Sequence, residues 1–329
     1  YEDKVYGLPY ALDNRILYYN VDLVNELSQT TDAQWLATKA AQLEGSTITG
    51  KPSDLIDKDG NVRAPQTWDE LQAYQELLTK QENGKITQLG FDVAVGNCMF
   101  VNTVWNKGGD FFDESGNSTI TTDPGVRKGF ETWFNLTHTF PAAKVNAFLG
   151  SAGESTTNLF WNKSVAMMIS TNEVPWQNDR LPEEKQLHLG AAPIPYDHIE
   201  ENRFNFTGGF SIEIANRLSK KSKAVQEAAW KFTKYMCSDE IQKEVLTESS
   251  NMPANTKIYD DLFKEITDPV KQVVLTEMSY RKPYQYIYNA PNWWGEVQNI
   301  VTDMVADKYT VEEALTNSEK AIEKLKASY

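Results

Sequence analysis

The sequence predicts an α/β fold, and three features of the chain support that class. Phe210 to Ala215 alternate between apolar and polar side chains, as a half-buried strand does, and two glycines stand directly before them. From Ser222 onward the apolar side chains recur at helical spacing, so a helix follows this strand. Val165 to Ile169 is continuously apolar, which is typical of a strand covered on both faces. A length of 329 residues leaves room for two domains, each with its own core.

The rest of the chain also alternates between strand and helix patterns. Residues 5–19 predict a strand, a loop through Asp13 and Asn14, and a second strand. Thr67 and Asp123 are good N-cap residues, and each precedes an apolar pattern of helical period. The other predicted elements are helices at 32–43, 100–106, 154–160 and 311–325, a strand at 89–95 and a hairpin at 110–122. A polar segment, 260–268, predicts a passage between the two domains.

Charge and spacing exclude several classes of partner and cofactor. The formal net charge is −14, so nucleic acid and anionic membranes would be repelled and are excluded as main partners. The three histidines show no metal-binding spacing. Gly45 to Lys51 has the spacing of a phosphate-binding loop, but Pro52 stands where a hydroxyl is required. Cys98 and Cys237 lie far apart and predict buried free thiols. We therefore expect no cofactor and no metal.

Aromatic side chains crowd one segment near the C-terminal end. Its rings are Tyr280, Tyr284, Tyr286, Tyr288, Trp293 and Trp294. Pro283 and Pro291 exclude a regular helix here, so the rings lie on a loop. Such a loop is typical of a binding surface, because the C–H faces of a sugar ring stack on aromatic side chains. A helix begins at its end, and Trp293 extends the apolar stripe that starts at Val297, which predicts a core position for Trp293 rather than Trp294.

Segments along nearly the whole chain resemble one known family, and they occur in that family's order. They are residues 1–20 (YEDKVYGLPYALDNRILYYN), 65–71 (PQTWDEL), 160–169 (FWNKSVAMMI), 189–193 (LGAAP), the strand and helices from Thr207 onward, and the final helices. The chain is similar to the bacterial extracellular solute-binding proteins of ABC importers, specifically the sugar-binding family that includes maltose-binding protein.

The resemblance implies a periplasmic-binding-protein-like fold, with two α/β lobes joined by a hinge that the chain crosses several times. It assigns 1–13 and 209–266 to the N-terminal lobe, and 14–208 and 267–329 to the C-terminal lobe. Family members carry roughly a hundred residues before the counterpart of Tyr1, so we expect an incomplete N-terminal lobe with an exposed sheet edge.

The resemblance also implies a function. The protein would be a monomeric, non-catalytic receptor outside the cytoplasm, either periplasmic or held by a lipid anchor that lies outside this sequence. It would capture a carbohydrate, most simply an oligosaccharide, between its lobes and deliver it to the permease subunits of an importer.

Candidate ligand-binding residues come from the family positions and from the expected sheet. Asp13 matches a carboxylate that accepts hydrogen bonds from sugar hydroxyls, although a loop-capping role is the alternative. Asn97 matches a ligand-contacting loop, with helix capping as the alternative. Glu173 and Trp176 follow the carboxyl end of a buried strand, where α/β sheets bind ligands. The full expected set is Asp13, Asn14, Asn97, Glu173, Trp176, Gly208, Gly209, Phe210, Arg281, Tyr284 and Trp294, with Trp294 as the sugar-stacking ring.

Two other functions remain open at this point. A binder of peptides or polyamines would also suit the negative charge. A glycoside hydrolase would show similar aromatic side chains and would need two carboxylates about 5 to 9.5 Å apart, a distance that sequence does not give. The aromatic loop favours a neutral sugar over a cationic solute.

Overall fold

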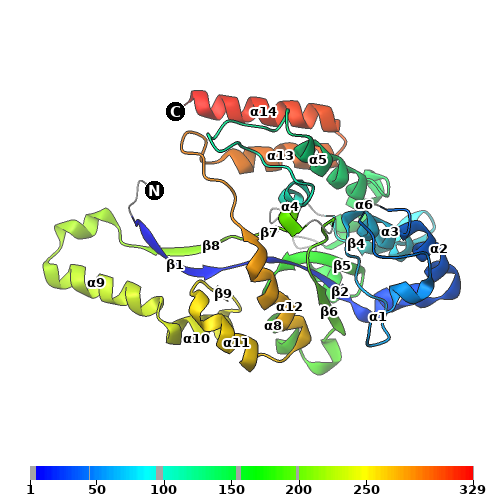
Figure 1. Cartoon of the computed structure of the whole chain (residues 1–329), viewed down its shortest axis with the longest axis horizontal. Helices are drawn as coiled ribbons and strands as arrows, with labels where there is room; N and C mark the ends of the chain where they lie inside the picture. Colours follow the sequence, from blue (N-terminus) through cyan, green and yellow to red (C-terminus); the bar gives the residue numbers. More distant parts are fainter. Residues whose placement is uncertain (1–4, 44, 94–98, 153–156, 198–199, 329) are drawn as a thin grey trace.

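The computed structural model of the chain describes residues 5–43, 45–93, 99–152, 157–197 and 200–328 (Figure 1). It consists of a broad body built on a five-stranded sheet and a narrow arm built on a three-stranded sheet. This confirms the predicted α/β class.

The large sheet has the strand order β3-β4-β5-β2-β6. Its strands are β2 (Arg15–Asn20), β3 (Lys80–Glu82), β4 (Lys85–Phe91), β5 (Val165–Thr171) and β6 (Leu189–Ala192). Strand β2 pairs antiparallel with both β5 and β6, whereas β4 runs parallel to β5. The first five residues of β5 are all buried, which confirms that this strand is covered on both faces.

The helices of the body lie on both faces of the large sheet or, toward the C-terminal end of the chain, form an outer layer that packs on the helix Pro124–Thr137. They are α1 (Val21–Val24), α2 (Thr30–Ala40), α3 (Trp68–Leu78), α4 (Met99–Asn106), α5 (Pro124–Thr137), α6 (Ala142–Leu149), α7 (Thr157–Trp161), α8 (Val174–Arg180), α12 (Pro269–Glu277), α13 (Trp293–Val305) and α14 (Val311–Ala327). The predicted caps form, since Thr67 accepts a hydrogen bond from the Glu70 amide and Asp123 accepts from the amides of Gly125 and Val126.

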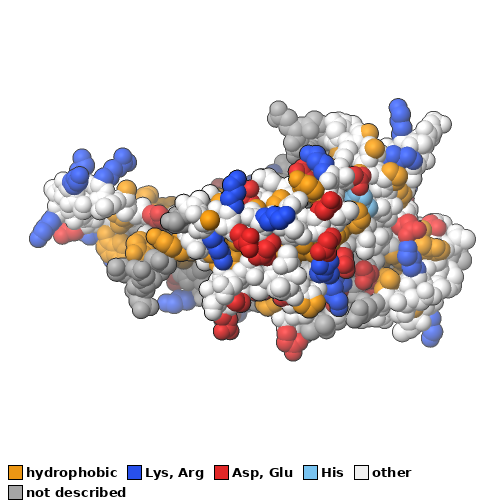
Figure 2. All heavy atoms as spheres, turned by 90° about the horizontal axis from the view of Figure 1, so that it is seen from above, with side chains coloured by type: hydrophobic (Ala, Val, Ile, Leu, Met, Phe, Trp, Pro, Cys, Tyr) orange, Lys and Arg blue, Asp and Glu red, His pale blue; other side chains and the backbone are white. Residues whose placement is uncertain are grey.

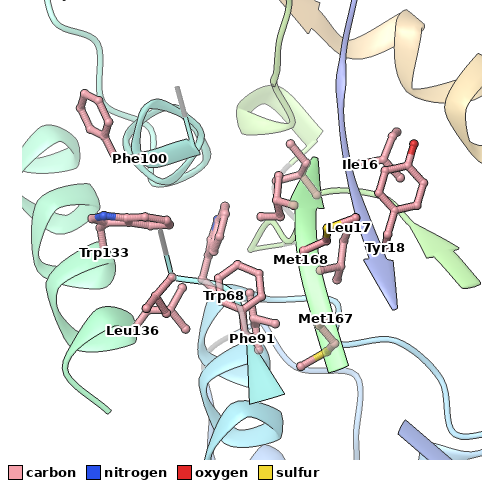
Figure 3. Packing of buried hydrophobic residues seen from close by; sticks show 14 of the residues in the cluster. Ile16, Leu17, Tyr18, Trp68, Phe91, Phe100, Trp133, Leu136, Met167 and Met168 are labelled. Carbon is pink, nitrogen blue, oxygen red and sulfur yellow. The ribbon is translucent and has the colours of Figure 1, made fainter. Parts of the chain in front are cut away.

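The core of the body lies between this sheet and its helices (Figure 3). Trp68 of α3 and Trp133 of α5 are at most 1% exposed and pack on one face of the sheet. Tyr18 of β2 points to the other face, so successive residues of this strand pack into the core on opposite sides of the sheet. The hairpin predicted at 110–122 forms as a short antiparallel pairing, with one bridge between Phe112 and Ser118 and hydrogen bonds of 2.9 and 3.0 Å on either side of it, from Asp113 to Asn117 and from Thr119 to Phe111.

The small sheet has the order β8-β1-β9, formed by β8 (Gly209–Glu213), β1 (Gly7–Leu12) and β9 (Met252–Pro253). Helices α9 (Lys223–Met236), α10 (Asp239–Ser249) and α11 (Tyr259–Glu265) accompany it. Strand β8 is an edge strand whose residues are exposed except for half-buried Ile212, so the described residues show the exposed edge that the sequence predicts.

Apolar side chains of the arm are unusually exposed. Phe210 is 67% exposed, and Trp230 and Phe232 of α9 are 46% and 60% exposed. Figure 2 shows hydrophobic side chains gathered along one border of this arm. The alternation of Phe210 to Ala215 therefore predicts the strand but not a buried face, because a pattern does not say what covers it.

The chain passes between arm and body at three places. The first passage joins β1 to β2 through Asp13 and Asn14, and the second joins β7 (Asn205–Phe206) to β8 through Thr207 and Gly208. The third joins α11 to α12 through residues 266–268. Most of the polar segment 260–268 is thus helix, and only its end crosses. A short strand, β10 (Arg281–Lys282), runs parallel to β7 beside the second passage.

Candidate ligand-binding site

The first two passages are bonded to each other at Asp13. Its carboxylate Oδ1 accepts a hydrogen bond of 2.5 Å from the Gly208 amide, and its carbonyl accepts one of 2.6 Å from the Thr207 hydroxyl. The Asp13 amide donates to the Gly208 carbonyl at 3.3 Å. Its Oδ2 has no hydrogen-bond partner among the described residues, and the side chain is 26% exposed. One carboxylate oxygen therefore serves the fold while the other remains able to accept a hydroxyl.

Arg15 joins Asp13 to an aromatic side chain that sequence reasoning missed. Its Nη1 lies 3.0 Å from Asp13 Oδ1, and its guanidinium carbon lies 4.9 Å from the centre of the Phe206 ring. The Arg15 side chain is 4% exposed. Residues two apart on an extended chain point to the same side, which was the available signal for pairing Arg15 with Asp13.

From Phe206 a row of rings continues to Trp294. Phe206 and Tyr284 stack with centroids 6.4 Å apart and planes 9° apart, and Tyr284 lies 5.9 Å from Trp294. Tyr284 and Trp294 are both half-buried. We call Asp13, Arg15, Phe206, Tyr284 and Trp294 the crossing cluster. It brings together three of the sequence-predicted site residues, Asp13 from the first passage and Tyr284 and Trp294 from the aromatic segment.

The two neighbouring tryptophans differ as the helical period predicts. Trp293 is 1% exposed, contacts the rings of Phe111 and Phe112, and donates its Nε1 hydrogen to the Gln285 carbonyl at 2.8 Å. Trp293 is therefore core, whereas Trp294 keeps part of its ring accessible.

Close packing at the second passage requires glycine at position 209 and leaves little room for a larger residue at position 208. A Cβ on Gly208 would lie 3.0 Å from Asp13 Oδ1, and one on Gly209 would lie 2.5 Å from the Ala11 carbonyl oxygen. Gly209 also has a φ of +154°. Both glycines thus position the crossing cluster by letting two backbone segments approach.

The Asn14 side chain lies in the interior of the protein. It is fully buried, and its Nδ2 donates to the Val274 carbonyl of α12 at 2.9 Å. Asn205 is nearby in the same framework, and it exchanges hydrogen bonds of 2.8 and 2.6 Å with the Arg15 backbone. These amides fix the passages to the body.

Trp176 lies in a pocket that contains no residue of the crossing cluster. Glu173, in contrast, lies beside the first passage, because Thr171 pairs with Arg15 and Asn172 accepts a hydrogen bond from the Asn14 amide at 3.4 Å. Trp176 of α8 lines a pocket of about 360 Å³ with residues of α10, α11 and α12, and Lys271 Nζ lies 5.3 Å from its ring centre. Burial raises the pKa of Tyr18 on β2 well above its usual value, and the negative charge of Glu173 raises it further. In Figure 1, α8 and α11 lie on one side of the path from β1 to β2, and α13 lies on the other.

Three further predicted residues have different surroundings. Phe210 is an exposed ring on the edge strand β8. Arg281 donates to the Met278 carbonyl at 2.6 Å. Burial raises the pKa of Tyr259 in the arm, and the positive charge of Arg281 partly opposes that increase. Asn97, like Cys98, lies outside the described residues.

The remaining expectations concern thiols, metals and membranes. Cys237 is a free thiol but is only half-buried, with its Sγ 3.6 Å from the Pro9 carbonyl, so full burial was wrong for it. Within the described ranges, no group of three or more His, Cys, Asp or Glu could hold a metal ion. No helix in those ranges is both long and apolar enough to span a bilayer.

Two α/β lobes, joined by three passages and carrying half-buried rings and a carboxylate at their junction, define a two-lobed ligand-binding protein. Residues 1–272 match the family model for bacterial extracellular solute-binding proteins, and the chain belongs to that family.

Known members support the same assignment. The chain is 23% identical to the maltodextrin-binding protein MdxE of Bacillus subtilis over 334 residues, covering all of this chain and 69% of that protein. It is 22% identical to a maltooligosaccharide ABC transporter solute-binding lipoprotein of Streptococcus pneumoniae, covering 92% of this chain and 61% of the relative. Maltose-bound MalE3 of T. maritima has the same fold, with a TM-score of 0.70, 22% identity and coverage of 99% of this chain and 74% of that one.

Proposed function

We propose that this protein is the substrate-binding component of an ABC importer, and that it captures a carbohydrate, most simply an oligosaccharide, at the crossing cluster. The observation that carries the proposal is the half-buried pair Tyr284 and Trp294, whose rings lie 5.9 Å apart and connect through Phe206 and Arg15 to Asp13. No chemical step on the sugar is part of the proposal.

The chemistry of this cluster suits a neutral sugar. A pyranose presents apolar C–H faces, which stack on rings such as Trp294 and Tyr284. It also presents hydroxyls, and Asp13 Oδ2 is an acceptor for one of them. Arg15 already balances the charge of Asp13. The cluster therefore offers no uncompensated charge to a cationic peptide or polyamine.

The binding mechanism is closure of two lobes on the ligand. We assign 1–13 and 209–266 to one lobe and 14–208 and 267–329 to the other, because the passages at Asp13, Gly208 and residues 266–268 divide the two sheets in that way. A sugar that contacts Trp294 on one lobe and the Gly208 passage beside the other binds the closed arrangement better than the open one. It shifts the population by that difference in affinity.

Relatives suggest the setting and the partners. The Streptococcus pneumoniae relative is called a maltooligosaccharide lipoprotein, and the Bacillus subtilis relative is named for maltodextrin. We infer an extracytoplasmic location, with attachment through a lipid anchor, and delivery of the sugar by a monomer to the transmembrane permease subunits.

A thermal-shift screen with mono- and oligosaccharides, peptides and polyamines tests the ligand class. A saturating sugar at 100 times its Kd adds about 2.7 kcal/mol to the free energy of unfolding. Stabilisation by sugars alone supports the proposal, and stabilisation by peptides or polyamines alone contradicts it. The same oligosaccharides, assayed for new reducing ends, separate a binder from a glycoside hydrolase, since only the enzyme produces them.

A further inference from the structure

A second cavity, of about 300 Å³, lies in the body at the outer edge of the large sheet. Strand β6 and the residue after it supply one wall, Ala191–Pro193, and the segment 57–66 supplies another. Tyr19 of β2, Tyr196 and Arg203 complete it. We call this cavity the β6 pocket. None of its lining residues belongs to the crossing cluster.

The two arginines of the β6 pocket do not attract an anion. Arg63 makes two parallel contacts with the Glu70 carboxylate, of 2.9 and 3.0 Å, and Arg203 lies 2.7 Å from Glu277. The Glu70 and Glu277 side chains are 0% and 2% exposed. Each guanidinium charge is therefore balanced by a buried carboxylate. Asp57 adds a negative charge at the rim, so the pocket favours neutral ligands over anions.

Three polar groups of the pocket have hydrogen-bonding capacity left. Gln66 accepts from the Thr47 hydroxyl at 2.9 Å through Oε1, and its Nε2 has no partner among the described residues. Asp57 accepts from the Asn61 amide at 2.9 Å through Oδ1, and its Oδ2 has no partner in that same part of the chain.

The third such group is the Tyr19 hydroxyl, which makes no hydrogen bond to any described residue. Burial, together with the charge of Asp57, raises the pKa of Tyr19 above its usual value. The hydroxyl therefore stays protonated at neutral pH and can donate as well as accept. One acceptor, one donor and one group of both kinds thus line the same cavity.

The walls of the pocket are held in place before any ligand arrives. The Arg203 guanidinium lies 3.5 Å from the Tyr280 ring centre and 5.0 Å from that of Tyr196. The Tyr196 amide donates to the Gln66 carbonyl at 3.0 Å. The Tyr19 ring lies against Gly190, where a Cβ would be 2.2 Å from the ring. Preformed walls reduce the ordering cost of binding.

We propose that the β6 pocket is a second binding site, and that it takes a neutral polyol of about the size of one monosaccharide. A sugar hydroxyl can donate to Asp57 and accept from Gln66, while the ring faces of Tyr19 and the apolar wall of β6 contact its C–H groups. The volume of about 300 Å³ lies at the small end of ligand pockets, roughly 300 to 1,000 Å³, which suits a single ring.

This site is separate from the crossing cluster. Tyr19 and Arg15 lie at opposite ends of strand β2, and four residues of a strand span about 13 Å. The proposal therefore does not rest on where the oligosaccharide binds. Its test uses both the wild-type chain and Trp294→Ala, which lacks the ring proposed to stack on the oligosaccharide.

The test measures binding of D-glucose and myo-inositol by saturation-transfer NMR, in the wild-type chain and in Trp294→Ala. We expect saturation transfer to at least one probe to persist in Trp294→Ala. Adding Tyr19→Phe and Gln66→Ala to either background should weaken that binding at least tenfold. Ala192→Leu, which fills the pocket without removing a polar group, should weaken it as well. Gln34→Ala, at an exposed glutamine of α2, is the matched control and should change nothing.

Each outcome decides the proposal. Thermal melting first shows that the pocket variants are folded, and Ala192→Leu gives an independent reading if Tyr19→Phe loosens the wall. Binding in Trp294→Ala that survives all the pocket variants would place the ligand elsewhere. Absence of saturation transfer to both probes in Trp294→Ala would also overturn the second site. Neither result depends on whether Trp294 contacts oligosaccharide.

Discussion

The Asp13 carboxylate lies 3.0 Å from Nη1 of Arg15, a side chain that is only 4% exposed. A buried guanidinium needs this partner, because an unpaired charge in the interior is costly. Asp13 therefore serves the fold through Oδ1, even where it serves a ligand through Oδ2. The two interpretations of Asp13 that the sequence left open, loop residue and sugar acceptor, are compatible.

Asp13→Ala should lower both stability and affinity. We expect the free energy of unfolding to fall by about 2 to 4 kcal/mol, less than for a fully buried pair because Asp13 is partly exposed. Sugar affinity should fall by about 1.5 to 3 kcal/mol, the range for a hydrogen bond to a charged group. Urea unfolding and calorimetry measure the two effects. Loss of affinity without loss of stability would show that Arg15 does not depend on Asp13.

Trp293→Ala and Trp294→Ala should affect different properties. Trp293 is fully packed, so its truncation should lower the free energy of unfolding by about 3 to 5 kcal/mol. Trp294→Ala should change stability little, because the Trp294 ring is only half-buried. Urea unfolding of the pair provides the comparison. Equal destabilisation by both substitutions would mean that Trp294 is also a core residue.

Gly209→Ala should destabilise the second passage. The new Cβ would lie 2.5 Å from the Ala11 carbonyl oxygen, a backbone atom that moves only with strand β1. We expect a loss of about 1 to 3 kcal/mol from this clash and the unusual φ. Gly150→Ala is the control, because a Cβ there meets nothing within 4 Å. Thermal melting of the two variants tests this, and a stable Gly209→Ala would show that the passages can separate freely.

The Arg63–Glu70 pair should make stability depend on acid pH. Burial by itself raises the pKa of Glu70, but hydrogen bonds from Arg63 and Ser46 outweigh it and hold that pKa below its ordinary value. The stabilisation is therefore complete above the unfolded pKa of about 4.3 and is lost as pH falls through the lower folded value.

Glu70→Gln should remove this part of the acid sensitivity, at a cost in stability near neutral pH. Glu76→Gln, at an exposed glutamate of the same helix, should leave the slope of stability against pH unchanged. Urea unfolding between about pH 3 and 7 measures both slopes. Identical slopes for Glu70→Gln and the wild type would contradict the pairing.

Local pattern predicted the elements that depend on local physics. The continuous apolar run of β5, the caps at Thr67 and Asp123, and the core position of Trp293 are all confirmed, because period and capping are short-range properties. The burial of β8 could not be predicted in the same way. Alternation marks an apolar face, but whether anything covers that face depends on distant chain.

The site was only partly predictable for a related reason. Family positions pointed to Asp13 and Trp294, and the aromatic loop pointed to Tyr284, but the link through Phe206 joins residues far apart in the sequence. Trp176 follows a buried strand as Glu173 does, yet α8 carries it into a different pocket. The direction of a side chain after a strand depends on the helix that follows, and the position of the strand end does not determine it.

Calorimetric titration of maltose, maltotriose and mannobiose into the wild-type chain and Trp294→Ala tests the central claim most directly. We predict saturable binding of at least one of these sugars to the wild type, with one sugar per chain at the crossing cluster. Trp294→Ala should weaken it by about 1 to 3 kcal/mol, roughly 5- to 150-fold, through lost stacking and burial. Equal affinity of the two chains for every sugar that binds, or no binding of any sugar to a folded wild type, would contradict a carbohydrate site at Trp294.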